Sequence, residues 1–318
     1  MMVNKLATAL ALLLLISSCA QSDNAPPDSS FAAATGGESS LRIVTINNYQ
    51  EALDLFNELN YTPEAWQAGI RIVPRLYLST ISERWSKVAT KEIDVALKKR
   101  LFFRAIGPLA LRSNELILVD RKRLEEIIRS GNYADEQPWL QKLAGQYRLQ
   151  TDDSSDYAAL ATSLQQRVDI VPPSLVLAQA AEESGWATSR FAFTGNALFG
   201  QWTWGGKGIR PEGQRANKGD YKIATFDSPL QSVQAHAMNL NTHNAYREFR
   251  ARRAELRNKG ARISGLALTG ALTGYSERGN DYVKSINSII NFNKLDPADD
   301  AYLDDKQPIV LINAEIAE

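Results

Sequence analysis

Two adjacent glutamates near the middle of the chain are the residues best suited to acid–base chemistry. Glu182 and Glu183 lie in the last turn of a helix predicted over about 174–184, which begins after two prolines and is followed by Gly185. Prolines are tolerated at a helix start, and glycine is the usual residue just past a helix end. Taken alone, paired glutamates at a helix end are more typical of a solvated terminus than of a catalyst.

The face that Glu183 shares with its helix is mostly apolar. Val176, Gln179 and Ala180 lie three to seven residues before it, a spacing that places all four on one side of the helix. Burial, the negative end of the helix dipole and the neighbouring Glu182 should each raise the pKa of Glu183. A carboxyl that stays protonated near neutral pH can give its proton to a leaving glycosidic oxygen.

A series of short motifs continues from this helix in a consistent order. In chain order they are Ala-Gln at 178–179, Glu-Ser-Gly-Trp at 183–186, Asn-Ala-Leu-Phe-Gly at 196–200, Thr-Phe-Asp-Ser at 225–228, Gly-Tyr-Ser at 274–276 and Tyr-Val-Lys-Ser-Ile at 282–286. Together they resemble the glucosaminidase family of peptidoglycan hydrolases, and its Bax branch in particular, over about 160–295. The resemblance implies an α+β, lysozyme-like fold, with a mostly helical catalytic domain, a small β-lobe and a helical N-terminal extension.

The resemblance also implies roles for individual residues. Glu183 takes the position of the general acid, and Tyr275 that of a cleft tyrosine that could bind the substrate N-acetyl group or position water. A second carboxylate is expected in the β-lobe, where Glu212 is the candidate and Asp220 stands behind it. The local sequence departs from the family pattern there, since Pro211 favours a turn. The other residues expected to bind substrate are Gln179, Asn196, Phe199, Trp202, Trp204 and Tyr282.

Tryptophans are concentrated just after the catalytic helix. Trp202 and Trp204 alternate in a strand-like segment and should share one side, where flat aromatic faces could bind sugar rings. Trp186 is expected in the core instead, closing the end of the helix.

Several other classes of protein are excluded. Lys plus Arg and Asp plus Glu are both 36, so no net field attracts nucleic acid, and the basic clusters at 121–123 and 250–253 are expected on solvated helix faces. His236 and His243 are seven residues apart with no further ligand motif, which argues against a metal site. The sequence has no Gly-x-Ser-x-Gly nucleophile elbow, which argues against a serine hydrolase. We therefore expect neither a metal nor another cofactor.

The first 19 residues have the pattern of a lipoprotein signal. A basic start is followed by an apolar stretch over 6–16 that is too short to span a bilayer, and Ile16-Ser17-Ser18-Cys19 resembles the bacterial lipobox. This predicts a lipid anchor on Cys19 and a place in the cell envelope. Ala20, in place of Asp, indicates the periplasmic face of the outer membrane. The alternative is a plain signal peptide with a coincidental cysteine.

The rest of the chain divides by composition. We expect a flexible Pro/Gly-rich linker over 20–40, a helical accessory region over 41–155, the catalytic domain over 156–296, and a polar tail over 297–318 with one apolar patch at 309–312. Gly107-Pro108 should break the helix predicted over 81–103.

The predicted activity is cofactor-free hydrolysis of the peptidoglycan bond that follows N-acetylglucosamine. Two alternatives remain open. A lytic transglycosylase also uses one glutamate on a similar fold, although it usually continues with a Gly-Leu-Met-Gln-like segment where this chain has Leu198-Phe199-Gly200-Gln201. The other is a non-catalytic, wall-binding lipoprotein. The expected partners are the peptidoglycan glycan strand and the membrane, and the sequence does not identify a protein partner.

Overall fold

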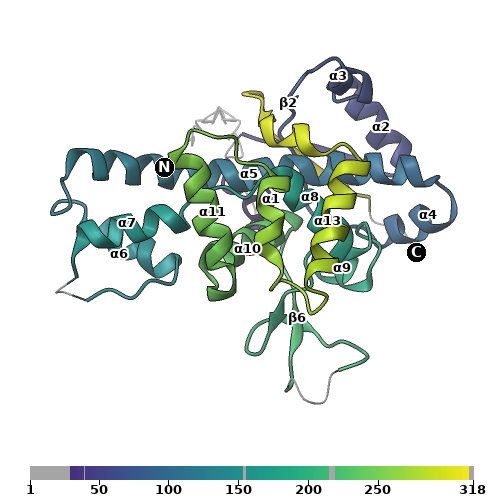
Figure 1. Ribbon diagram of the computed structural model, residues 1–318. Helices are drawn as coiled ribbons and strands as arrows, with labels where there is room; N and C mark the ends of the chain where they lie inside the picture. Colours follow the sequence, from purple (N-terminus) through teal and green to yellow (C-terminus); the bar gives the residue numbers. More distant parts are fainter. Residues whose placement is uncertain (1–28, 39, 153–154, 215–218, 315–318) are drawn as a thin grey trace, which may run out of the picture.

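Helices make up most of the protein in the computed structural model, which describes residues 29–38, 40–152, 155–214 and 219–314. Figure 1 shows one long helix crossing the molecule, with shorter helices packed along it and a small β-lobe projecting from them. The predicted signal peptide and Cys19 lie outside the described residues. Within the described residues, no helix is both long and apolar enough to cross a membrane.

The long helix is α5 (Val95–Ser130), and it runs straight through Pro108. The predicted break at Gly107-Pro108 is therefore wrong. Proline removes one backbone hydrogen bond, but Ile106 and Leu109 on either side are buried in the main core, and this burial keeps the segment helical. The helix expected over 81–103 is instead interrupted before α5, since α4 covers only Glu83–Lys91 and Asp94 caps α5.

The main core surrounds α8 (Pro173–Ser184), whose residues 173–181 are all buried. The N-cap residue, Pro172, has no side-chain acceptor that could cap this helix. Asp299 caps it instead, since its carboxylate accepts hydrogen bonds from the Ser174 amide at 2.8 Å and the Ser174 hydroxyl at 2.7 Å. The elements that complete the catalytic half are α9 (Arg190–Gly195), α10 (Pro229–Thr242), η1 (Asn244–Tyr246), α11 (Arg247–Asn258), α12 (Gly265–Leu268), η2 (Thr269–Leu272), α13 (Asn280–Phe292) and η3 (Asp296–Asp300).

Both basic clusters contribute side chains to the interior, contrary to expectation. Asp169, which lies just before α8, is buried and pairs with Arg257, Arg253 and Arg121. Burial alone would raise the pKa of Asp169, but the hydrogen bonds from Arg257 and the charges of the other two arginines hold it below its usual value. These contacts join α5 and α11 to the segment that leads into α8.

The N-terminal region contains strands as well as helices, and the C-terminal segment completes its sheet. The parallel order is β1 (Arg42–Ile46), β8 (Ile309–Asn313) and β3 (Leu76–Leu78), while β2 (Ile72–Val73) pairs with β7 (Tyr302–Leu303). The apolar patch at 309–312 is thus the central strand of a sheet and not part of a separate tail. Helices α2 (Tyr49–Glu58), α3 (Pro63–Gln67) and α4 belong to the same region.

Three further helices pack on these elements, two from the N-terminal part of the chain and one from the start of the region expected as the catalytic domain. α6 (Gln137–Gln146) and α7 (Tyr157–Arg167) pack on the second half of α5 around a satellite apolar cluster. α1 (Ser29–Thr35) replaces part of the expected linker. It packs on α10, where the Ser228 hydroxyl donates a hydrogen bond to the Ala33 carbonyl.

The β-lobe is a small antiparallel sheet in the order β4 (Trp202–Thr203), β6 (Lys222–Ala224) and β5 (Gly208–Ile209). The predicted α+β class is confirmed, with mostly helical structure, small sheets and an N-terminal extension that is itself mostly helical.

Candidate active site

A strained turn ends α8, the helix that carries Glu183. Gly185, Trp186 and Ala187 all have positive φ, at 58°, 65° and 61°, a conformation that residues other than glycine rarely adopt. Ser184 holds the turn closed, because its hydroxyl donates to the Ala180 carbonyl at 2.6 Å and accepts from the Ala187 amide at 2.8 Å. This arrangement explains why serine and glycine follow Glu183 in the motif.

Trp186 anchors this turn in the core, as predicted. Its ring packs edge-on against Phe102 and Phe103 of α5. From α4, the Trp85 indole donates a hydrogen bond of 3.0 Å to the Trp186 carbonyl. The N-terminal extension therefore supports the backbone directly beyond the candidate catalytic residue.

Glu183 is half-buried, and its pKa is raised. Burial is the largest cause and the charge of Glu182 adds to it, whereas a hydrogen bond with Tyr282 and the charge of Arg278 oppose it. The direction predicted from the sequence is confirmed, with desolvation as its main source.

Glu182 is directed to different partners. Its carboxylate accepts hydrogen bonds from the Arg278 guanidinium and from the Ser285 hydroxyl, the latter at 3.1 Å. Of the two glutamates, Glu183 is the one that is hydrogen-bonded to Tyr282, one of the tyrosines described next.

Three tyrosines gather at Glu183. The rings of Tyr275 and Tyr282 are stacked with centroids 5.1 Å apart, and Tyr246 lies 5.8 Å from Tyr275. Burial is the main cause that raises the pKa of each hydroxyl, and the charge of Glu183 contributes to all three shifts. Tyr246 and Tyr282 are buried and Tyr275 is only half-buried, so the predicted cleft tyrosine is the one with an accessible surface.

A second layer of polar groups lies behind the tyrosines. Gln179 is fully buried, and its amide donates to the Tyr282 hydroxyl at 2.9 Å and contacts His236 Nε2 at 3.1 Å. His236 is also fully buried, with its ring stacked 3.9 Å from Phe199 and Nδ1 3.5 Å from the Tyr275 hydroxyl. Burial lowers the pKa of His236 to about 3, so its imidazole is neutral at physiological pH.

Four of the predicted substrate-binding residues therefore lie in the interior. Gln179, Phe199 and Tyr282 support the site from behind. Asn196 joins parts of the fold, since its amide oxygen accepts from the Ile81 amide at 2.9 Å and its nitrogen donates to the Phe226 carbonyl at 3.1 Å. In the structure these side chains stabilise the site and do not form its surface.

The β-lobe carries the remaining predicted residues. The rings of Trp202 and Trp204 are 6.0 Å apart, both are exposed, and Trp202 stacks on Tyr221. The Glu212 side chain is 91% exposed and lies 3.7 Å from Arg190, while Asp220 pairs with Arg210. The structure brings the tryptophans together but does not bring Glu212 into contact with the Glu183 cluster.

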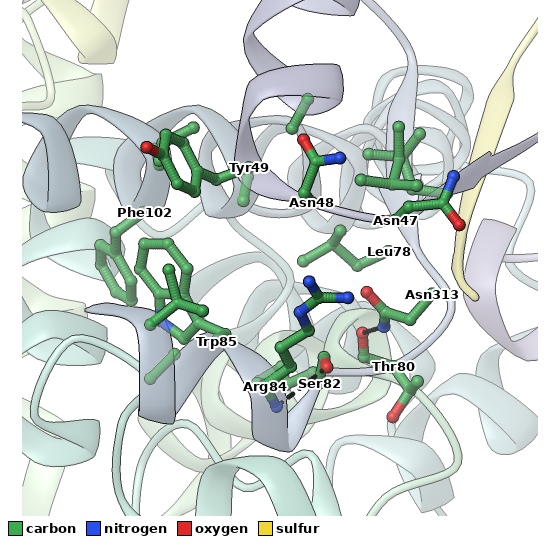
Figure 2. Close-up of a pocket in the computed structure, with 18 of the residues that line it drawn as sticks. Asn47, Asn48, Tyr49, Leu78, Thr80, Ser82, Arg84, Trp85, Phe102 and Asn313 are labelled. Carbon is green, nitrogen blue, oxygen red and sulfur yellow. Dashed lines mark hydrogen bonds between the residues drawn. The ribbon is translucent and has the colours of Figure 1, made fainter. Parts of the chain in front are cut away.

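A separate cavity of about 200 Å³ lies on the other side of the turn, against the parallel sheet, α2 and α4. Figure 2 shows Trp85, Phe102 and Leu78 around it, with Asn48 and Asn313 nearby. None of the residues of the Glu183 cluster lines this cavity. Among the described residues, no group of three or more His, Cys, Asp or Glu side chains is placed to hold a metal ion.

Three residues of the site were not predicted, namely Tyr246, Arg278 and His236. The sequence carried a signal for His236, because Val233, Ala237 and Leu240 flank it at helical spacing. A polar residue on such an apolar face is buried and needs a hydrogen-bond partner. Tyr246 and Arg278 have no comparable pattern around them.

Comparison with known proteins finds related sequences. Residues 158–295 match the glucosaminidase family model, described as mannosyl-glycoprotein endo-beta-N-acetylglucosaminidase. The chain belongs to the glucosaminidase family. It is homologous to protein Bax of Escherichia coli strain K12, with 34% identity over 186 residues that cover 58% of this chain and 66% of Bax, just under two thirds of that protein.

A solved structure is also similar. The crystal structure of the catalytic domain of the autolysin Auto from Listeria monocytogenes matches with a TM-score of 0.37 and 16% identity, covering 68% of this chain and 96% of that domain. Membership of the family rests on the sequence matches.

The contacts of Glu183 predict how its pKa responds to its charged neighbours. Replacing Arg278 with Gln should raise the pKa of Glu183 further, because a cation that favours the ionised form is lost. Replacing Glu182 with Gln should lower it, because a like charge is lost. Titration of the side-chain carboxyl by ¹³C NMR measures both changes. Shifts of the same sign in the two variants would contradict this account.

Proposed function

We propose that the protein is an endo-β-N-acetylglucosaminidase that hydrolyses peptidoglycan glycan strands at the bond following N-acetylglucosamine. The observation that carries this proposal is Glu183, a half-buried carboxyl with a raised pKa beside the stacked Tyr275 and Tyr282. It lies within the family match and in the Glu-Ser-Gly-Trp motif. Both tyrosines come from the last two motifs of the series, at 274–276 and 282–286.

In the proposed reaction Glu183 acts as general acid. Its proton passes to the glycosidic oxygen as the bond from that oxygen to the anomeric carbon breaks. A water molecule forms the new bond to the anomeric carbon and releases a proton to a base. The raised pKa favours the protonated form of Glu183 before the reaction, and the Tyr282 hydrogen bond stabilises the carboxylate that the reaction leaves.

The base for this water stays a prediction. Glu212 is the proposed candidate, with Asp220 behind it, because both are on the β-lobe and both are accessible to solvent. Glu212 would have to approach Glu183 by movement of the β-lobe. The separation of the two carboxyls in a substrate complex would then distinguish a retaining from an inverting reaction.

The Glu183→Gln variant tests the proposal. Loss of the transferable proton should reduce the release of soluble muropeptides from purified sacculi by about 10²–10⁴-fold, the usual contribution of a general acid. Folding should be unchanged by circular dichroism, because glutamine keeps the shape of the side chain. Glu255→Gln, on the exposed face of α11, is the matched control and should retain full activity.

Mass spectrometry of the products separates the alternatives. Reducing N-acetylglucosamine ends support the proposal, whereas anhydro-muramic ends identify a lytic transglycosylase. Wild-type protein that binds sacculi without solubilising them would identify a wall-binding lipoprotein instead. Full activity in the Glu183→Gln variant would overturn the proposed mechanism.

We also propose that Trp202 and Trp204 bind sugar rings. Their exposed, adjacent rings support this, and Trp202 is held in place by its stacking on Tyr221. Trp204→Ala should raise the KM for glycan strands by about two- to tenfold, as expected for loss of one aromatic contact, with little effect on kcat. Tyr302→Ala removes an exposed ring from β7 and serves as the control. Equal KM values in all three proteins would refute this role.

The remaining proposal concerns location. We propose that Cys19 is acylated and anchors the protein to the periplasmic face of the outer membrane, on the strength of the lipobox-like Ile16-Ser17-Ser18-Cys19 and of Ala20. Because Cys19 is the single cysteine, Cys19→Ser should move the protein from the membrane fraction to the soluble fraction. Mass spectrometry of the mature N-terminus gives the direct measurement. A mature N-terminus that lacks acyl groups would contradict the anchor.

A further inference from the structure

Five side chains at the site form one hydrogen-bonded chain. It runs from Glu183 to the Tyr282 hydroxyl, then to the Gln179 amide at 2.9 Å, to His236 Nε2 at 3.1 Å, and from His236 Nδ1 to the Tyr275 hydroxyl at 3.5 Å. Both ends of the chain belong to the proposed catalytic site, and its interior members are buried. The donor in each link can be worked out.

The direction starts at the Gln179 amide. Its nitrogen donates to the Tyr282 oxygen at 2.9 Å, so the single O–H of Tyr282 is left to donate to Glu183, whether that carboxyl is protonated or ionised. The Gln179 oxygen is left facing His236, so Nε2 of the imidazole carries the proton and donates.

The tautomer of His236 then sets the direction of the last hydrogen bond, between His236 and Tyr275. A neutral imidazole has one N–H, so with Nε2 protonated Nδ1 is an acceptor. Tyr275 O–H therefore donates to Nδ1. The contact is long at 3.5 Å, and hydrogen bonds at catalytic sites commonly shorten when substrate is bound. His236 is fully buried and its ring is stacked on Phe199, so it is held in one orientation.

We propose that His236 is a positioning residue, held as the neutral Nε2–H tautomer, that makes Tyr275 a hydrogen-bond acceptor toward the substrate. This inference rests on the proposed glucosaminidase function. Because the Tyr275 hydroxyl donates its proton to His236 Nδ1, the Tyr275 oxygen can only accept a hydrogen bond from a bound substrate or water. It would accept from the N–H of the substrate acetamido group or from the attacking water, and it would not donate to the acetamido carbonyl.

The chain also orients the acid. The Glu183 oxygen that accepts from Tyr282 is occupied, so the proton of the protonated carboxyl is carried by its other oxygen. That oxygen is the one left free for the glycosidic oxygen. Reversal of the Gln179 amide would invert the whole chain, placing the proton on Nδ1 and removing the Tyr282 donor from Glu183.

Nitrogen NMR tests the tautomer without substrate. The chain has two histidines, so ¹⁵N-histidine labelling gives two ring systems, and His243→Asn assigns the signals. We expect His236 to show a protonated Nε2 and an unprotonated Nδ1, both at neutral pH and at about pH 5, because burial keeps the ring neutral. A proton on Nδ1, or a charged ring at either pH, would overturn the proposal.

A double-mutant cycle tests the action through Tyr275. His236→Phe should lower kcat by about two- to tenfold, the range for loss of one hydrogen bond, in the wild-type background. It should have little effect in a Tyr275→Phe background, because the hydroxyl that His236 orients is already absent. His243→Asn is the matched control and should leave kcat unchanged, since His243 is exposed and outside the chain of hydrogen bonds.

The outcomes separate this inference from the proposed function. Equal losses in both backgrounds would show that His236 acts by supporting the fold alone and would refute the positioning role. Partial recovery by His236→Gln, which restores a polar group facing Tyr275, would support it. If Glu183→Gln kept full activity, the proposed function would fail, while the NMR measurement would still decide the tautomer.

Discussion

The site depends on the burial of α8. This helix is enclosed along most of its length by α5, α12 and α13, and only its last turn reaches the surface. A carboxyl at that position is partly removed from water, and desolvation becomes the largest cause of the raised pKa of Glu183. The Asp299 cap and the Ser184 turn fix the two ends of the helix, so the depth of Glu183 in the protein is set by the packing of the whole core.

The N-terminal extension and the C-terminal segment both contribute to the structure that holds this end of α8 in place. Phe102 of α5 and Trp85 of α4 hold the turn after Glu183, while Asn196 bonds to the backbone just after β3. β3 in turn pairs with β8, near the end of the chain. A single apolar core includes residues from Tyr77 to Ala298, so the turn that positions the acid is supported from both ends of the sequence.

The sequence predicted the local features of the site and missed those that depend on distant partners. The apolar face of α8, the Gly185 stop and the raised pKa of Glu183 follow from residues within one helix. Pro108 could not be assigned from sequence, because tertiary burial outweighs its local cost. The patch at 309–312 is a central strand because β1 and β3 pair with it on either side, and both of these strands are distant in sequence. Side chains of the basic clusters are internal because they pair with the buried Asp169. The motif singled out Asn196 and Phe199 as substrate-binding residues, but a motif does not distinguish a residue that forms a site from one that is buried and supports it.

Charged side chains near Glu183 lie toward the surface, whereas the layer behind it is neutral. Glu182 and Arg278 pair at the surface, where solvent screens them and where each partly cancels the effect of the other on Glu183. Behind Glu183, the described residues that form the hydrogen-bonded layer are neutral, namely two buried tyrosines, an amide and an imidazole that burial keeps uncharged. A buried cation at the position of His236 would stabilise the carboxylate and lower its pKa, so that less of the carboxyl would carry a proton to donate near neutral pH. A neutral hydrogen-bonded layer can instead orient the reacting groups and leave the pKa of Glu183 governed by its own burial.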